Sequence, residues 1–253
     1  MSIRSARSLL LAAATLALLG CEKPSTTGPG ASGELVVRIG ASAPLTGPQA
    51  HIGKDNESGT RMAIEDANAK GIVIDGRKVR FELISEDDQA DPKTATIVAQ
   101  KLVDNKVSGV IGHLNSGTSI PASRIYHDNG IVQISPSATA VEFTANGYKT
   151  AFRVMANDAQ QGRVLGEYAT GELAAKKIAV IDDRTGYGQG LADEFIKSAQ
   201  ANGAQIVARE YTNDKAYDFT AVLTAVKGRQ PDLLFFAGMD PQAGPMAKQL
   251  KAL

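Results

Sequence analysis

Aromatic rings and surplus charge are both scarce in this sequence of 253 residues. It contains no tryptophan, and Phe, Trp and Tyr together make up 5% of the chain. So few rings argue against a surface that binds nucleic acid by stacking on its bases. The 27 basic and 27 acidic residues cancel, which also argues against a surface for the phosphate backbone. We therefore expect no nucleic-acid partner.

Cysteine is nearly absent, and its single occurrence is informative. Cys21 has no partner in the chain, so no intrachain disulfide can form. It follows Arg4, Arg7 and the apolar run LLLAAATLALLG, which is too short to span a bilayer comfortably. Residues 1–20 resemble a bacterial lipoprotein signal peptide, which implies that the cysteine is lipidated; the alternative is an ordinary secretory signal with a chance cysteine. Residues 21–33 are rich in Pro, Gly, Ser and Thr, which predicts a flexible tether.

The chain is well supplied with hydrophobic residues, 43% of the total, and they fall into alternating strand and helix patterns. From Glu34 onward, short apolar runs are followed by amphipathic stretches, one of which is expected to open at Pro121. Such alternation is typical of parallel sheets with βαβ crossovers. We predict an α/β fold with two doubly wound parallel-sheet lobes, residues 34–155 and 156–253. Only about three strands fall in the second lobe, which is small for a covered sheet, so we expect that lobe to be truncated.

No catalytic or metal-binding pattern stands out. No serine lies in a G-x-S-x-G turn, and no group of His, Cys and Asp has metal-ligand spacing. The three histidines are scattered, and no residue near His113 in the sequence serves as an orienting acid. We expect His51, His113 and His127 to be surface or loop residues. The prediction is a protein that is not an enzyme and that uses no catalytic residue, metal or cofactor.

Two further loops have interpretations simpler than chemistry. In SEDDQADPK, we expect Asp91 to cap the helix that begins at Pro92, and the other acids to be solvated. In DDRTGYGQG, Gly186 and Gly188 resemble part of a dinucleotide-binding motif. The helix-packing glycine of that motif is misplaced, however, and Tyr187 would crowd a pyrophosphate. A glycine turn at a helix start is the favoured interpretation.

Neutral hydroxyl groups gather where two strands are expected to end. HLNSGTS carries Ser116, Thr118 and Ser119, and SPSATA carries Ser137 and Thr139, without a cationic side chain. At such a place, backbone N–H groups and hydroxyls can bind the carboxylate of a zwitterion, while carbonyls and a threonine hydroxyl bind its ammonium. The alternative is that these hydroxyls only cap helices and turns. The residue pattern alone leaves both interpretations open.

At these loops the sequence resembles a known family, the branched-chain amino-acid binding proteins of ABC importers, which are class I periplasmic binding proteins. The resemblance is carried by APLTGPQAHIGKDNESG, DDQADPKTA, VIGHLNSGTSIPASRIYHDNGI, ISPSATAVEFTANGY and YGQGLADEF. It implies two lobes that are joined by a hinge and close on a ligand. It also implies that Ser116 and Thr139 hold the α-carboxylate and the α-ammonium, and that the Ser137 carbonyl meets the ammonium. The other residues implied to line the ligand site are Leu114, Asn115, Tyr187, Ile52 and Met239, the last two at positions that are often aromatic.

The resemblance implies a function in transport. The expected protein is a substrate-binding lipoprotein that captures a branched-chain or related amino acid and delivers it to an ABC permease in the inner membrane. Its expected place is the periplasmic side of the cell envelope, on a membrane to which the lipid on Cys21 anchors it. The alternative is a ligand-sensing receptor of the same fold that binds an amide, a urea or an aromatic acid.

Overall fold

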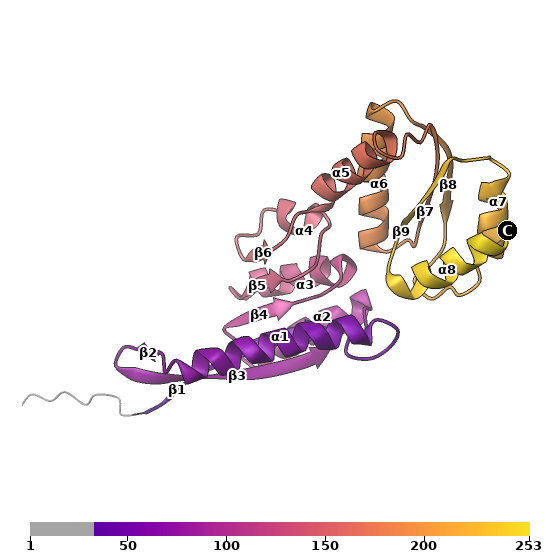
Figure 1. Ribbon diagram of the computed structural model, residues 1–253. Helices are drawn as coiled ribbons and strands as arrows, with labels where there is room; N and C mark the ends of the chain where they lie inside the picture. The colour runs from indigo at the N-terminus through magenta and orange to yellow at the C-terminus, as the bar shows by residue number, and fades with distance from the viewer. Residues whose placement is uncertain (1–32) are drawn as a thin grey trace, which may run out of the picture. The chain divides into compact units, whose positions relative to one another are not determined.

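The computed structural model describes residues 33–253, which form two β-sheets with helices packed against them (Figure 1). The predicted signal peptide, Cys21 and nearly all of the predicted tether lie outside the described residues. None of the helices in the described part is long and apolar enough to cross a membrane.

The first sheet has the strand order β2-β3-β1-β4-β5-β6. Its strands are β1 (Leu35–Ala43), β2 (Val73–Ile74), β3 (Arg77–Asp87), β4 (Gly109–Gly112), β5 (Val132–Ser135) and β6 (Ala151–Arg153). All neighbours pair in parallel except β2 with β3. The chain passes from β1 to β3 on one side and then to β4 on the other, so the strand order reverses between β1 and β4. Open α/β sheets bind ligands beyond the carboxyl ends of the strands at such a point.

The second sheet repeats this topology with three parallel strands in the order β8-β7-β9. These are β7 (Lys177–Asp182), β8 (Gln205–Tyr211) and β9 (Leu233–Ala237). The reversal here lies between β7 and β9. The loops that follow these two strands are therefore the ones expected to face a ligand.

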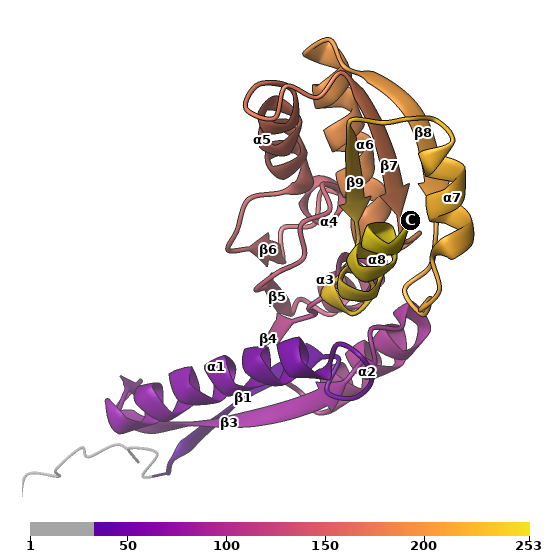
Figure 2. The ribbon, with the colours of Figure 1, turned by 45° about the vertical axis from the view of Figure 1, so that its right-hand side comes forward.

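Helices connect the strands and cover the sheets (Figure 2). They are α1 (Ala50–Ala69), α2 (Pro92–Asp104), α3 (Ser116–Asp128), α4 (Glu142–Ala145), α5 (Asp158–Thr170), α6 (Gly186–Ala201), α7 (Thr220–Lys227) and α8 (Asp240–Ala252). The predicted cap of α2 is confirmed, because the Asp91 carboxylate accepts a hydrogen bond from the Thr94 N–H. Thr185 caps α6 in the same way through Gly188, as expected of a turn at a helix start.

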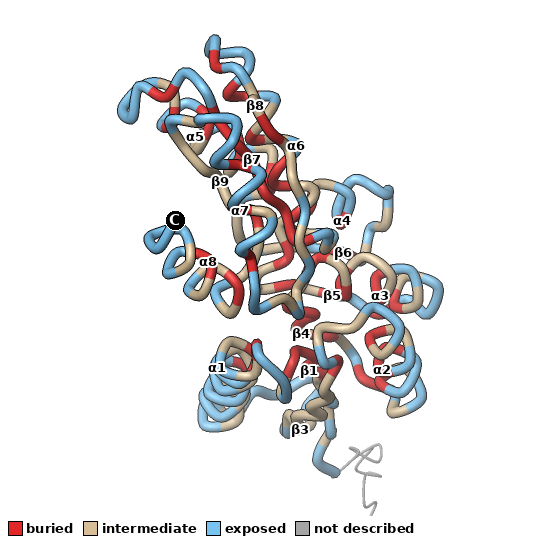
Figure 3. Tube along the Cα trace, turned by 90° about the vertical axis from the view of Figure 1, so that its right-hand side faces the viewer, coloured by how far each residue is buried: buried red, intermediate tan, exposed pale blue. Residues whose placement is uncertain are grey.

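Each sheet has its own hydrophobic core. In the second sheet, β7 is buried along most of its length (Figure 3), and the rings of Phe195 on α6 and Phe235 on β9 stack with centroids 3.7 Å apart. In the first, Leu102 and Tyr126 are fully buried between α2, α3 and the sheet. Because α3 and α6 pack on their sheets through these cores, the first turn of each helix is held on a rigid support.

Three local features differ from the predictions. Helix α3 begins at Ser116 instead of Pro121; the proline lies in the second turn, where it removes only the hydrogen bond to the Gly117 carbonyl. The short helix α4 was not predicted. Strand β2, also unpredicted, pairs antiparallel with β3 across a tight hairpin at Asp75 and Gly76, both of which have positive φ. An Asp-Gly pair is a recognised hairpin signal and could have revealed this edge strand.

Candidate functional site

A cavity of about 240 Å³ brings together residues from loops far apart in the sequence. All eight of the predicted ligand-binding residues line it, and one further residue, Gln161, joins them. The complete lining is Ile52, Leu114, Asn115, Ser116, Ser137, Thr139, Gln161, Tyr187 and Met239.

The topology explains this convergence. Leu114, Asn115 and Ser116 follow β4 and lead into α3, whereas Ser137 and Thr139 follow the neighbouring strand β5. Because β4 and β5 are parallel and adjacent, their carboxyl ends carry both loops to the same edge of the sheet. The second sheet contributes Tyr187 in the first turn of α6, after β7, and Met239 as the residue that precedes α8, after β9.

Hydrogen bonds fasten the two hydroxyl-rich loops to each other. The buried Ser116 hydroxyl oxygen accepts from the backbone N–H groups of Thr139 and Ala140, at 3.2 and 3.1 Å. In the opposite direction, the Ser137 hydroxyl donates to the Leu114 carbonyl at 2.7 Å. The Ser116 hydroxyl therefore still has a hydrogen to donate, and it also supports the loop that presents Thr139.

The N-terminus of α3 is open to an anion. The first N–H groups of a helix have no partner within the helix, and they carry partial positive charge. Asn115, at the capping position, makes no side-chain cap; its amide nitrogen instead donates to Gln49 Oε1 at 2.7 Å. With no cap from Asn115, this helix start suits a small carboxylate.

Polar atoms that lack hydrogen-bond partners lie at Thr139, which lines the cavity, and at Asp158 behind it. The Thr139 hydroxyl is buried without a hydrogen bond, and so are both carboxylate oxygens of the fully buried Asp158. Burial raises the pKa of Asp158 to about 6, even though nearby Thr139 and the charge of Arg153 act to lower it. Asp158 lies against Thr139, since its N–H donates to the Thr139 carbonyl at 2.8 Å. A buried carboxylate without a partner is costly, and a cation beside it would offset that cost.

Sequence reasoning missed two residues of this region, Asp158 and Gln161, both in the first turns of α5. An aspartate at the start of a helix is a common capping residue, so its type and position carried no functional signal.

Gln161 lies beside Tyr187, and burial raises the pKa of the Tyr187 phenol while Gln161 lowers it. The phenol is therefore neutral at physiological pH and can donate a hydrogen bond.

The prediction for His113 was wrong. The side chain is fully buried, and its Nδ1 lies 2.7 Å from Asp88 Oδ2 and 3.0 Å from the Ser42 hydroxyl. Its Nε2 lies 3.1 Å from the Tyr126 hydroxyl. Asp88 is fully buried too, so the expectation that the acids around it are solvated fails at this position. The acid was overlooked because it follows β3, which reaches His113 only across the sheet through β1.

This buried pair has a structural role. Neither side chain lines the cavity, and both are held by hydrogen bonds within the fold. The backbone carbonyl of His113 accepts from the hydroxyls of Ser119 and Ser135, at 2.9 and 2.7 Å. The pair thus fixes the strand end immediately before Leu114 and Ser116.

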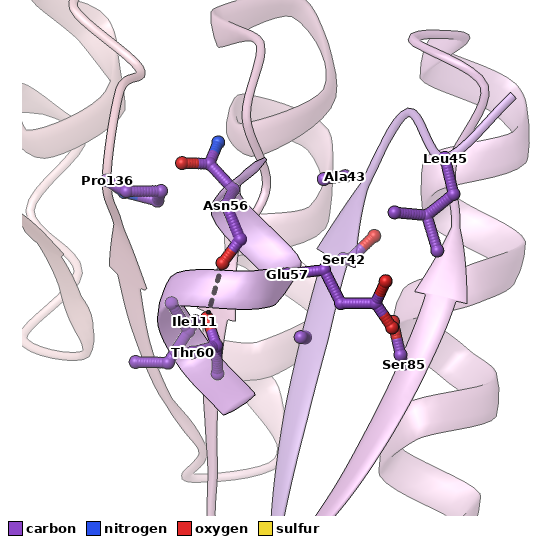
Figure 4. A pocket seen from close by; sticks show the side chains of 10 residues that line it. Ser42, Ala43, Leu45, Asn56, Glu57, Thr60, Ser85, Ile111 and Pro136 are labelled. Carbon is purple, nitrogen blue, oxygen red and sulfur yellow. Dashed lines mark hydrogen bonds between the residues drawn. The ribbon is translucent and has the colours of Figure 1, made fainter. Parts of the chain in front are cut away.

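Two other features were candidates for a binding site, a metal-ligating cluster and a small pocket beside α1, and neither suits an organic ligand. Within residues 33–253 there is no group of three His, Cys, Asp or Glu side chains that could hold a metal ion. A pocket between α1 and the first sheet, lined by Asn56, Thr60 and Ile111 among others, measures about 10 Å³ and has room for little more than one water (Figure 4). The Thr60 hydroxyl in that pocket donates to the Asn56 carbonyl and belongs to the helix itself (Figure 4).

Comparison with known proteins agrees with the resemblance noted in the sequence. The family model described as "Periplasmic binding protein" matches residues 36–253. The chain belongs to this family. Its two largely parallel sheets have the fold of a class I periplasmic binding protein, as predicted.

Several relatives of this chain are named for the amino acids that they bind. Leu/Ile/Val-binding protein homolog 1 of Brucella abortus (strain 2308) is 40% identical over 214 residues, which cover 85% of this chain and 57% of the relative. An amino acid binding protein of Pseudomonas aeruginosa is 39% identical over 216 residues, with the same coverage. The branched-chain amino acid transporter substrate binding protein LivJ of Streptococcus pneumoniae, solved with isoleucine, has a TM-score of 0.76 and 30% identity over 86% of this chain and 61% of LivJ. The chain thus spans 57% of the length of these curated relatives.

Proposed function

We propose that this protein captures an α-amino acid with an apolar side chain, branched-chain or closely related, between its two lobes. The observation that supports this most strongly is the single cavity lined by Ser116, Thr139 and the other predicted residues from both sheets. The names of the relatives, which refer to Leu/Ile/Val or to amino acids, support the same proposal.

In this proposal the α-carboxylate binds at the start of α3. It accepts the Ser116 O–H and the free backbone N–H groups of the first helical turn, where the helix dipole favours negative charge. Ser116 suits this role because its oxygen already accepts from two backbone N–H groups, which leaves its hydrogen for the ligand.

The α-ammonium binds on the Thr139 side. It donates to the unpartnered Thr139 hydroxyl and to the Ser137 carbonyl, and it lies in the field of the unpartnered Asp158 carboxylate. Hydrogen bonds to charged groups contribute roughly 1.5–3 kcal/mol each. The ammonium also compensates the buried charge of Asp158, so this side of the site selects for a cationic group.

The ligand side chain then lies among Ile52, Leu114 and Met239, with Tyr187 closing over it. These neighbours are largely apolar, and a cavity of about 240 Å³ is smaller than the pockets that take drug-sized ligands. Both features favour a small aliphatic side chain over a long or charged one.

The place of the protein in the cell follows from the same proposal. Residues 34–155 and 156–253 are the two lobes, residues 1–20 are the export signal, and residues 21–33 tether the lobes to lipidated Cys21. Ligand closes the lobes because it binds the closed state better than the open one. The closed form then delivers the amino acid to an ABC permease in the inner membrane, as a transport receptor without enzymatic activity.

Titration calorimetry on the full-length protein, with analogues that each lack one feature of leucine, tests this proposal. We expect leucine, isoleucine or valine to bind, and leucinamide and isocaproate to bind weakly because they lack the carboxylate and the amine. Lipidation is tested separately by mass spectrometry of the native protein and of its Cys21→Ser variant. Tight binding of a simple amide, a urea or an aromatic acid, with no amino acid bound, would instead support the sensor alternative.

A further inference from the structure

The two lobes touch where the N-terminus of helix α3 meets the N-terminus of helix α6, beside the ligand cavity. Gly117 is the second residue of α3, and Gly186 is the first residue of α6. A methyl group placed on Gly186 would lie 3.3 Å from both the Cα and the nitrogen of Gly117. At this point the two backbones therefore meet with no side chain between them.

The contact lies beside the residues proposed to bind the ligand. Gly117 directly follows Ser116, and Gly186 directly precedes Tyr187, and both of these neighbours line the cavity. The separation of the two glycines therefore sets the distance across the cavity between Ser116 and Tyr187. We propose that Gly117 and Gly186 form the stop that determines how closely the lobes close on the ligand; this inference rests on the proposed capture of an amino acid between them.

The contact is asymmetric, which makes the inference testable. A methyl on Gly186 would meet backbone atoms at 3.3 Å, closer than ordinary van der Waals contact. A methyl on Gly117 would lie 3.7 Å from the Gly186 nitrogen and 3.9 Å from Cγ of Pro92, which is ordinary contact. Because the backbone fixes the direction of Cβ, no rotamer relieves the contact at Gly186, so the two facing backbones must move apart by a few tenths of an ångström.

Alanine substitutions distinguish this role from a general effect on folding. Alanine forms helix better than glycine, so Gly186→Ala is expected to leave the ligand-free protein at least as stable as the wild type. In the full-length protein we expect Gly186→Ala to weaken leucine binding about tenfold, which is about 1.4 kcal/mol. Gly117→Ala is expected to weaken it less. The control is Gly59→Ala, in the middle of α1, where an added methyl meets nothing within 4 Å.

Titration calorimetry gives the affinities, and urea unfolding gives the ligand-free stability. Binding by Gly186→Ala within about twofold of the wild type, which is about 0.4 kcal/mol, overturns the proposal. An equal or larger loss in Gly117→Ala overturns it as well, because the distances predict the opposite order. A loss of binding that tracks a loss of ligand-free stability also counts against it, since misfolding would then explain the result.

A distance measurement separates this inference from the proposed function. Spin labels on Glu65→Cys and Lys197→Cys, both exposed positions on α1 and α6, report the spacing of the lobes in a Cys21→Ser background. We expect Gly186→Ala to shift the distribution to longer distances, with or without leucine, and Gly59→Ala to match the wild type. If the wild type binds no amino acid, the proposed function fails, while the ligand-free distances still decide the role of the glycines. Identical distributions for the wild type and Gly186→Ala overturn the proposed stop.

Discussion

Replacing Asp158 by asparagine should change stability and binding in opposite directions. The carboxylate is fully buried, neither oxygen has a hydrogen-bond partner, and burial raises its pKa from 3.8 to about 6. Each pKa unit corresponds to about 1.4 kcal/mol. A charged Asp158 therefore costs the folded protein up to about 3 kcal/mol at pH 7.5.

The sign follows from proton binding. The folded-state pKa lies above the unfolded value, so between about pH 4 and pH 6 the folded protein holds the proton more tightly. Stability therefore falls as pH rises through this window and levels off above it. From pH 5 to pH 7.5, wild type should lose about 1.4 kcal/mol that the Asp158→Asn variant does not lose.

The net stability gain in the variant is smaller than the full cost of the charge. The new amide is also buried without a partner, which costs roughly 1 kcal/mol or more, and the favourable interaction of a negative charge with the start of α5 is lost. We expect Asp158→Asn to be about 1 kcal/mol more stable than wild type at pH 7.5. Because wild type regains about 1.4 kcal/mol at pH 5, the variant should be about 0.4 kcal/mol less stable than wild type there.

Leucine binding, in contrast, should be weaker in Asp158→Asn than in wild type. The ammonium of the ligand loses its counter-charge, so the affinity for leucine at pH 7.5 is expected to fall about 10- to 100-fold. In wild type the affinity should fall about tenfold at pH 5, where about a tenth of Asp158 is ionised, and the variant should lose most of this pH dependence.

Urea unfolding and titration calorimetry at pH 5 and pH 7.5, on full-length wild type and variant, measure both effects. The reasoning is refuted if Asp158→Asn is less stable than wild type at pH 7.5. It is also refuted if both proteins bind leucine with equal affinity and equal pH dependence, because Asp158 would then have no part in holding the ammonium.

Four further changes probe the site and its supports. Thr139→Val removes a hydroxyl proposed to bind the ammonium, so leucine affinity by calorimetry should fall about 10- to 100-fold; unchanged affinity would remove Thr139 from the site. Ser116→Ala should lower affinity similarly and also cost roughly 1–3 kcal/mol in urea unfolding, because two backbone N–H groups lose their acceptor. His113→Leu leaves a buried carboxylate without its imidazole, and a loss well below the expected 3–5 kcal/mol in urea unfolding would contradict a buried pair. Phe235→Ala removes the ring stacked on Phe195 and should lower the free energy of unfolding by about 3 kcal/mol with no direct effect on the site, so unchanged stability would argue against that packing.

Much of the fold could be read from local patterns. Strand and helix periodicity located the main elements, and the Asp91 cap marked the start of α2. The two errors at α3 and β2 have local causes: a proline is tolerated in the second turn of a helix, and an Asp-Gly hairpin signal was passed over. The convergence of the eight predicted residues was also accessible, because hydroxyl groups follow adjacent strands and the motifs around them resemble a known family.

Local sequence indicated which hydroxyl-bearing residues gather at one edge of the sheet, since strand ends in a parallel sheet share one edge and the residue types there are visible in the chain. Tertiary structure alone decided which polar groups would be buried and with what partners. Asp88 meets His113 across the sheet, Asp158 is enclosed without a partner beside Thr139, and Gly186 touches a backbone on the other lobe. Burial, pKa and contact across the cavity depend on elements brought together from distant parts of the chain, and no local pattern encodes them.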